Sequence, residues 1–129
     1  MYLITYDESD DIIFVELKGE SDFEDLKQHL KNLRSRFKHH DNLFILADQT
    51  SGKVEVNMLT IAIDVYELKS DVQALSADHA KIFSAQVVKN ANDKGILHLH
   101  QSLNENLSNY QVKLFESKQE ARAWLKENQ

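Results

Sequence analysis

The sequence predicts an α/β protein with a single domain, residues 1–129, built on a mixed but mostly parallel sheet. Apolar runs rich in β-branched and aromatic residues alternate with segments whose apolar residues recur at helical spacing. Proline is absent, glycine occurs only three times, and neither a linker nor an internal repeat is visible. The expected order is β-β-α-β-α-β-α-β-α, with four helices, and the opening hairpin supplies the antiparallel strand.

The first third of the chain predicts a hairpin followed by a helix. Residues 2–6 and 12–17 have strand composition and are separated by the acidic loop "DESDD". Ser21 and Glu24 have the spacing of a capping box, which predicts a helix start there. The buried face of this helix is expected to carry Phe23, Leu26, Leu30, Leu33 and Phe37.

The middle of the chain predicts two buried strands with a helix between them. The run "NLFILAD", residues 42–48, is typical of a strand covered on both faces. A helix is expected over Ile61 to Val72, with Asn57 as its N-cap. Residues 80–88 predict the next strand.

The last third predicts helix, strand and helix. Residues 92–106 space their apolar side chains as a helix does, and residues 110–115 have strand composition. The final helix is expected over 117–128, with Ser117 and Glu120 as a second capping box.

Composition narrows the classes of function. The sequence is 42% hydrophobic and 28% charged, which is typical of a globular protein, and its formal charge of −6 argues against a nucleic-acid partner. Without cysteine it has no disulfide or thiol chemistry, which fits a reducing cytoplasm. We see no signal peptide and no apolar run long enough for a membrane span.

The stretch "FILADQTSGK", residues 44–53, contains the pair Gly52-Lys53 but is not a Walker A loop. That motif needs a glycine where Ala47 stands and a hydroxyl side chain where Val54 stands. We therefore predict no nucleotide-hydrolysis site here.

Other enzyme and metal signals are weak. Neither Ser51 nor Ser84 lies in a G-x-S-x-G elbow. His98 and His100 would point apart on a helix, although they would share one face if "ILHLH" were a strand. We predict no catalytic residue, no metal site and no cofactor.

A run of basic residues follows the start of the first predicted helix. A solvated helix face and an anion-binding face both explain it, and the negative overall charge favours the solvated face. The run comprises Lys27, Lys31, Arg34, Arg36 and Lys38.

The ending "VKLFESKQEARAWL", residues 112–125, resembles the carboxyl-terminal signature of the SpoIIAA-like proteins, a branch of the STAS superfamily. The resemblance implies the STAS architecture over almost the whole chain. In the anti-sigma-factor antagonists of this superfamily, the third strand ends in an aspartate-containing loop. That loop leads to a serine that a partner kinase phosphorylates at the start of the second helix.

Asp48 resembles the loop aspartate, but Asn57 and Met58 stand where the family's serine would be. Asparagine can cap a helix but cannot accept phosphate, so the resemblance implies that the serine phosphoswitch is absent. Thr50 and Ser51 are hydroxyl residues that lie earlier in the loop.

The first functional hypothesis is a non-enzymatic regulatory domain that binds a protein, a second copy of itself included. Its candidate contact residues are Asp48, Thr50, Ser51, Asn57, Met58 and Leu59. The alternative is a carrier of a small apolar ligand, such as a lipid or fatty acid, held between sheet and helices. An enzyme is the third and least favoured hypothesis.

Overall fold

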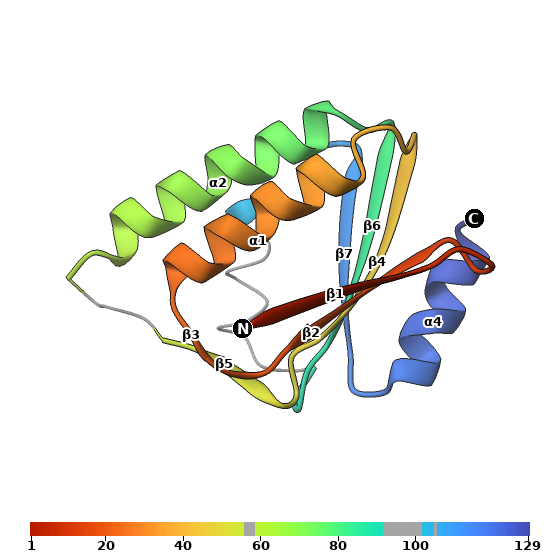
Figure 1. Ribbon diagram of the computed structural model, residues 1–129, viewed down its shortest axis with the longest axis horizontal. Helices are drawn as coiled ribbons and strands as arrows, with labels where there is room; N and C mark the ends of the chain where they lie inside the picture. Colours follow the sequence, from red (N-terminus) through yellow and green to blue (C-terminus); the bar gives the residue numbers. More distant parts are fainter. Residues whose placement is uncertain (56–58, 92–101, 105) are drawn as a thin grey trace.

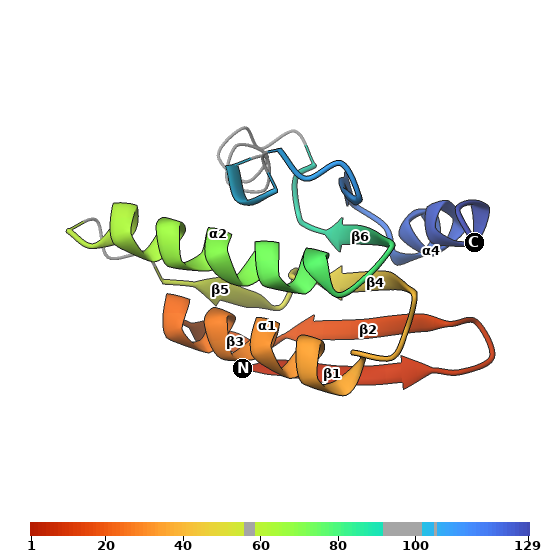
Figure 2. The same ribbon diagram turned by 90° about the horizontal axis from the view of Figure 1, so that it is seen from above.

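The computed structural model describes residues 1–55, 59–91, 102–104 and 106–129. Its main sheet has five strands in the order β1-β2-β4-β6-β7. The β1–β2 pair is antiparallel and the other three pairs are parallel, as expected from the alternating element order (Figure 2). The strands are β1 (Tyr2–Asp7), β2 (Ile12–Leu17), β4 (Asn42–Asp48), β6 (Lys81–Val87) and β7 (Tyr110–Phe115).

All five strands lie where the sequence predicts them, to within one residue at each end. The fully apolar run of β4 lies at the centre of the sheet, between β2 and β6, and is buried from Leu43 onwards. A central strand with helices on both sides needs apolar side chains on both faces, which explains why its residues do not alternate.

A second, two-stranded parallel sheet was not predicted. It pairs β3 (Gly19–Ser21) with β5 (Gly52–Val54). Strands of three residues leave too short a pattern to stand out in a sequence. The pair explains Gly52: a Cβ there would lie 2.6 Å from the carbonyl oxygen of Leu17, so the backbones can approach only at a glycine.

Helices α1 (Phe23–Arg36) and α2 (Ile61–Ala77) lie on one face of the sheet, and α4 (Lys118–Glu127) lies on the other (Figure 1). No helix within the described ranges has the length and apolar character needed to cross a bilayer. The described residues contain three helices rather than the predicted four. The predicted third helix, 92–106, falls mostly outside the described residues.

Two predicted helix starts need correction. The capping box of α1 is formed by Asp22 and Asp25, one residue later than the predicted Ser21 and Glu24: the Asp25 N–H donates to Asp22 at 2.9 Å, and the Asp22 N–H donates to Asp25 at 3.1 Å. An aspartate pair satisfies the same backbone donors, and Ser21 instead ends β3 as a buried residue.

Helix α2 has Thr60 at its N-cap, so the prediction of Asn57 for that position is wrong. At the start of α4, the Ser117 hydroxyl accepts from the N–H groups of Gln119 and Glu120, which confirms Ser117 as the N-cap. The reciprocal bond from the Ser117 N–H to the Glu120 side chain, which the predicted capping box needs, does not occur among the described residues.

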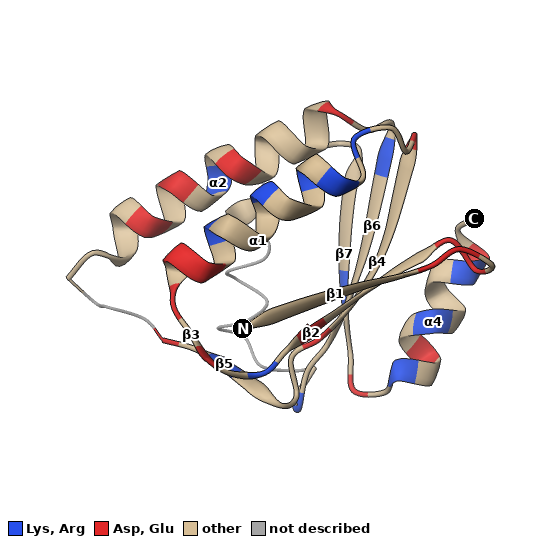
Figure 3. Cartoon of the chain, in the orientation of Figure 1, with Lys and Arg blue, Asp and Glu red and all other residues tan. Residues whose placement is uncertain are grey.

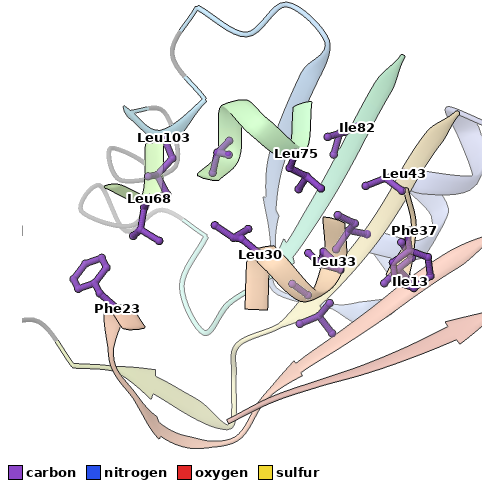
Figure 4. Close-up of a cluster of buried hydrophobic side chains, with 14 residues drawn as sticks. Ile13, Phe23, Leu30, Leu33, Phe37, Leu43, Leu68, Leu75, Ile82 and Leu103 are labelled. Carbon is purple, nitrogen blue, oxygen red and sulfur yellow. The ribbon is translucent and has the colours of Figure 1, made fainter. Parts of the chain in front are cut away.

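The sheet separates two apolar cores. Under α4, Phe44 and Phe83 stack with ring centroids 5.5 Å apart, and Trp124 meets Phe83 edge-on at 5.9 Å. On the other face, Leu33, Phe37 and Leu43 gather where α1 ends, close to the sheet (Figure 4). The first core is therefore a closed aromatic layer, and the second is densest at one end of the sheet.

Ion pairs join elements that are distant in the sequence. Asp10, in the acidic loop of the β1–β2 hairpin, pairs with Arg122 and with Lys126 of α4, the latter at 3.3 Å (Figure 3). Part of the basic run of α1 faces α2: Lys27 pairs with Glu67, and Arg34 with Asp78 at 2.6 Å. These pairs support the hypothesis of an ordinary solvated face for the basic run.

Candidate functional site

A cavity of about 540 Å³ lies between the sheet and the helices α1 and α2. The two helices lie near the sheet at the amino ends of β4 and β6 and diverge from it toward the carboxyl ends (Figure 1). The cavity occupies the wide end of this wedge. It is partly open to solvent there, beside β5.

The walls of the cavity are mainly apolar. Helix α1 contributes side chains at positions that repeat every three or four residues, and the strands contribute alternate residues. The principal apolar wall residues are Val15, Phe23, Leu26, Leu30, Ile45 and Val112. Such a surface favours contact with hydrocarbon over contact with water.

Three polar side chains cross the sheet face of the cavity in one hydrogen-bonded row. Gln49 Nε2 donates to Gln86 Oε1, and Gln86 Nε2 donates to Ser84 Oγ at 2.6 Å. Tyr110 of β7 also lines the cavity. Burial raises the pKa of Tyr110 to about 12, against a smaller opposing effect of Ser84, so its phenol is neutral at physiological pH.

The opposite wall holds His29, which stacks on Tyr2 with ring centroids 4.5 Å apart. His29 is 8% exposed, and its Nδ1 has no hydrogen-bond partner among the described residues. Burial lowers the pKa of His29 from 6.5 to about 4, so the imidazole is neutral at pH 7. It is a second polar group in a largely apolar chamber.

Cations lie at the open rim of the cavity. Lys53 of β5 and Lys89, just after β6, both line it and are exposed. Neither makes a salt bridge with an acid among the described residues. The cavity therefore has two exposed cations at its rim, and its lining also includes the carboxylate of Asp48.

Asp48 serves a structural role in the loop that the sequence singled out. Its Oδ1 accepts from the N–H of Thr50 at 2.9 Å and from the Thr50 hydroxyl at 2.6 Å, and its Oδ2 lies 3.1 Å from Lys118 Nζ. Burial raises the pKa of Asp48, but the bonds from Thr50 and Lys118 outweigh burial and leave that pKa below its usual value. Asp48 thus fixes the turn after β4 and joins it to α4.

The remaining predicted contact residues are only partly placed. Ser51 is exposed in the turn before β5, and Leu59 is exposed just before α2. Asn57 and Met58 lie outside the described residues. The structure thus brings Asp48 and Thr50 into direct contact, and their link to the start of α2 remains a prediction.

The sequence reasoning missed the polar row. Its signal was present in β6, which reads "KIFSAQV": Ser84 and Gln86 are two apart and therefore share one face of a strand expected to be buried on both. Two polar residues on one face of a buried strand need partners, and that need predicts a polar site. Among the described residues, no three His, Cys, Asp or Glu side chains gather in a way that could hold a metal ion.

This architecture is that of a single-domain α/β protein with a mixed sheet and helices on both faces. The chain belongs to the SpoIIAA-like family, whose profile matches residues 12–126. The resemblance seen in residues 112–125 is thereby confirmed, and the relation to STAS domains with it.

Solved structures share the fold. An uncharacterized protein of the DUF3478 family with a SpoIIAA-like fold, from Shewanella loihica PV-4, is similar with a TM-score of 0.63 and 18% identity, over 97% of this chain and 92% of that one. The anti-sigma factor antagonist SpoIIAA in its unphosphorylated form gives a TM-score of 0.47 and 8% identity, over 93% and 92%. A search of curated proteins found no match.

Proposed function

We propose that this protein binds a small, mainly apolar ligand in the cavity between the sheet and helices α1 and α2. The observation that carries the proposal is the cavity itself: about 540 Å³ with mainly apolar walls. Ligand sites are usually clefts of roughly 300–1,000 Å³ with apolar walls and a few placed polar groups. The volume is also more than three times that of the ~150 Å³ engineered cavity that holds benzene.

The driving force would be the transfer of hydrocarbon from water to these walls. Each buried methylene contributes about 0.8 kcal/mol, so a chain of eight would contribute roughly 6 kcal/mol before the cost of association. The polar row would fix the orientation of the ligand, because its groups are the polar ones on the sheet side of the cavity. This is the carrier hypothesis drawn from the sequence.

We propose binding without catalysis. Ser84, which lines the cavity, accepts from Gln86, and a glutamine amide is not a general base for a hydroxyl. His29 stacks on Tyr2 at the opposite wall. The same proposal keeps the cytoplasm as the location, which is a prediction from the cysteine-free sequence.

A specific surface supports a second function, the docking of a protein partner, which is the regulatory hypothesis. Leu59, Ile63 and Tyr66 are 95%, 62% and 76% exposed. Ile63 and Tyr66 are three residues apart and so share one face at the start of α2, and Leu59 lies just before this helix. We call these three side chains the stripe. Large apolar side chains gathered on a surface mark interaction sites more often than isolated ones do. The resemblance to anti-sigma-factor antagonists drawn from residues 112–125 is in keeping with a regulatory role.

Dye binding tests the cavity against the stripe. The neutral apolar dye Nile red should bind the wild-type protein with a rise in fluorescence, and an Ala47→Phe variant should lose most of this signal because Ala47 lines the cavity. A matched variant, Ile63→Ser, changes the stripe and should keep the signal. Loss of the dye in Ile63→Ser with retention in Ala47→Phe would contradict the cavity proposal.

Native mass spectrometry of gently purified protein provides an independent test, since a bound ligand adds a discrete mass. Sedimentation of wild-type protein and of the Ile63→Ser variant tests the docking function. A complex that forms in the wild type and is weakened in the variant supports docking through α2. Equal association of both proteins argues against it.

A further inference from the structure

We infer that the ligand is an amphiphile with an anionic head group, a carboxylate or a phosphate, which Lys53 and Lys89 bind at the rim while the apolar tail fills the cavity. The inference rests on the proposed function and specifies the chemistry of the same site. It names the charge of the polar end of the ligand, the direction in which the ligand lies and the two residues that receive its head group.

The cavity has a narrow end and a wide end. At the amino ends of β4 and β6, helices α1 and α2 lie near the sheet, and Leu33, Phe37 and Leu43 gather there (Figure 4). At the carboxyl ends the helices diverge, and the cavity opens to solvent beside β5 (Figure 1). A bound ligand would have one end among apolar side chains and the other end near water. An apolar tail with one polar head group satisfies both environments.

The side chains at the wide end include two cations. Lys53 lies on β5, and Lys89 is the second residue after β6, at the carboxyl end of that strand. Both residues line the cavity and both are exposed. A lysine packs its methylene stem along apolar surface and keeps its ammonium group in water. Gln49, the first member of the polar row, follows β4 at the same end of the sheet.

The positive charge at the rim is not taken up by neighbouring acids. Among the described lining residues the one acid is Asp48, and its Oδ2 lies 3.1 Å from Lys118 Nζ, so its charge is already paired. Glu20 is the register partner of Lys53 in the β3–β5 pair, but the described residues show no ion pair between the two. An anion can therefore bind Lys53 and Lys89 without breaking an existing ion pair.

The rest of the molecule does not supply this attraction. The chain has a formal charge of −6, so its overall field repels anions. A preference for a negative head group would thus be a local property of the rim. It should depend on these two lysines and not on lysines elsewhere.

Four probes with the same ten-carbon chain test the head group: decanoate, decyl phosphate, 1-decanol and decyltrimethylammonium. Each would be titrated at pH 8, below the concentration at which it aggregates, against Nile red bound to the protein. The better of the two anions should displace the dye at about a fivefold lower concentration than 1-decanol, as expected for two ion pairs at an exposed rim. Decyltrimethylammonium should be the weakest probe, because the lysines repel its charge. Comparison of decanoate with decyl phosphate shows which anionic head group fits better.

Lysine variants test the assignment to the rim. Lys53→Gln and Lys89→Gln should each reduce the advantage of the anion over 1-decanol, and the double variant should bring the two probes to within about twofold of each other. Lys81→Gln is the matched control, because it makes the same change at an exposed residue that starts β6 and lies outside the cavity lining. The control should leave the ratio unchanged.

Salt provides a second measurement, which needs no variant. Because ions screen charges at an exposed rim, the advantage of the anion should shrink as sodium chloride is raised from about 0.02 to about 0.5 M. The uncharged 1-decanol, titrated at each concentration of salt, corrects for the effect of salt on hydrocarbon.

The outcomes are distinct. If 1-decanol displaces the dye as well as both anions do, or if the cationic probe binds best, the inference is overturned and the proposed function stands. An anion advantage that persists in the double variant, or that salt leaves unchanged, would also overturn it, since the head group would then lie away from the rim. If none of the probes displaces the dye, the proposed function itself fails.

Discussion

Enlarging the side chain at Ala47 gives the sharpest test of the cavity. Ala47 lies near the end of β4 with its side chain on the α1 side of the sheet, and it lines the cavity. Leucine adds three carbons, each contributing about 0.8 kcal/mol when buried, so roughly 2.4 kcal/mol is available. The loss of side-chain freedom removes about 0.5–1 kcal/mol of this gain. We expect Ala47→Leu to raise the free energy of unfolding by about 1.5 kcal/mol.

Ala85→Leu is the matched control on the opposite face of the sheet. Ala85 is fully buried against α4, in the aromatic core that contains Phe83 and Trp124. Three added carbons have no space there, so overpacking should cost about 1–3 kcal/mol. The alanine-to-leucine substitution is thus expected to raise the free energy of unfolding on β4 and to lower it on the neighbouring strand β6.

Urea unfolding followed by circular dichroism measures both changes. Thermal unfolding should separate the two variants as well, since 1 kcal/mol corresponds to about 4 °C for a domain of this size. The ligand should bind Ala47→Leu more weakly than the wild type, because the leucine occupies part of its space. If Ala47→Leu destabilises the protein as much as Ala85→Leu does, there is no free volume beside Ala47 and the reasoning is refuted.

Three further predictions concern individual residues. The pKa of His29 falls from 6.5 to about 4 on folding, so the unfolded chain binds the proton more readily and stability is lost as the pH falls through this range. Between pH 7 and pH 4, the free energy of unfolding of the wild type should therefore fall by about 3 kcal/mol more than that of His29→Phe. Urea unfolding at each pH measures this difference. Gly52→Ala should cost about 1–3 kcal/mol, since the new Cβ meets the Leu17 backbone, and an unchanged urea midpoint would contradict the close approach. Asp48→Ala should cost about 1–2 kcal/mol in the same assay through the lost bonds to Thr50, whereas a residue that served only a partner would leave stability unchanged.

Strand order and positions could be predicted from the sequence because each strand has a composition that helices lack. The run 42–48 is an example: its five residues from Leu43 to Ala47 are all apolar, and such a run is typical of a central strand of an α/β fold. Helix starts were less certain, since Ser21, Asp22 and Asn57 are all competent caps and only the packing of the following helix decides among them.

Most of the candidate site could not be predicted from the sequence. A cavity arises from the angle between helices and sheet, and no local pattern encodes that angle. The polar row depends on the pairing of distant segments: Gln49, in the turn after β4, donates to Gln86 of β6, which lies 37 residues further along the chain. The emphasis on Asp48 followed from the family resemblance, and the structure gives that residue a role in the turn.

Residues on the two faces of the sheet are expected to diverge in sequence at different rates. Between the sheet and α4, the stacked rings of Phe44 and Phe83 and the edge-on ring of Trp124 leave no room for independent change, so a substitution there needs a compensating one nearby. Around the cavity, a wall residue can change size without such compensation. Relatives that keep the aromatic layer can therefore acquire new ligand preferences while the fold is preserved.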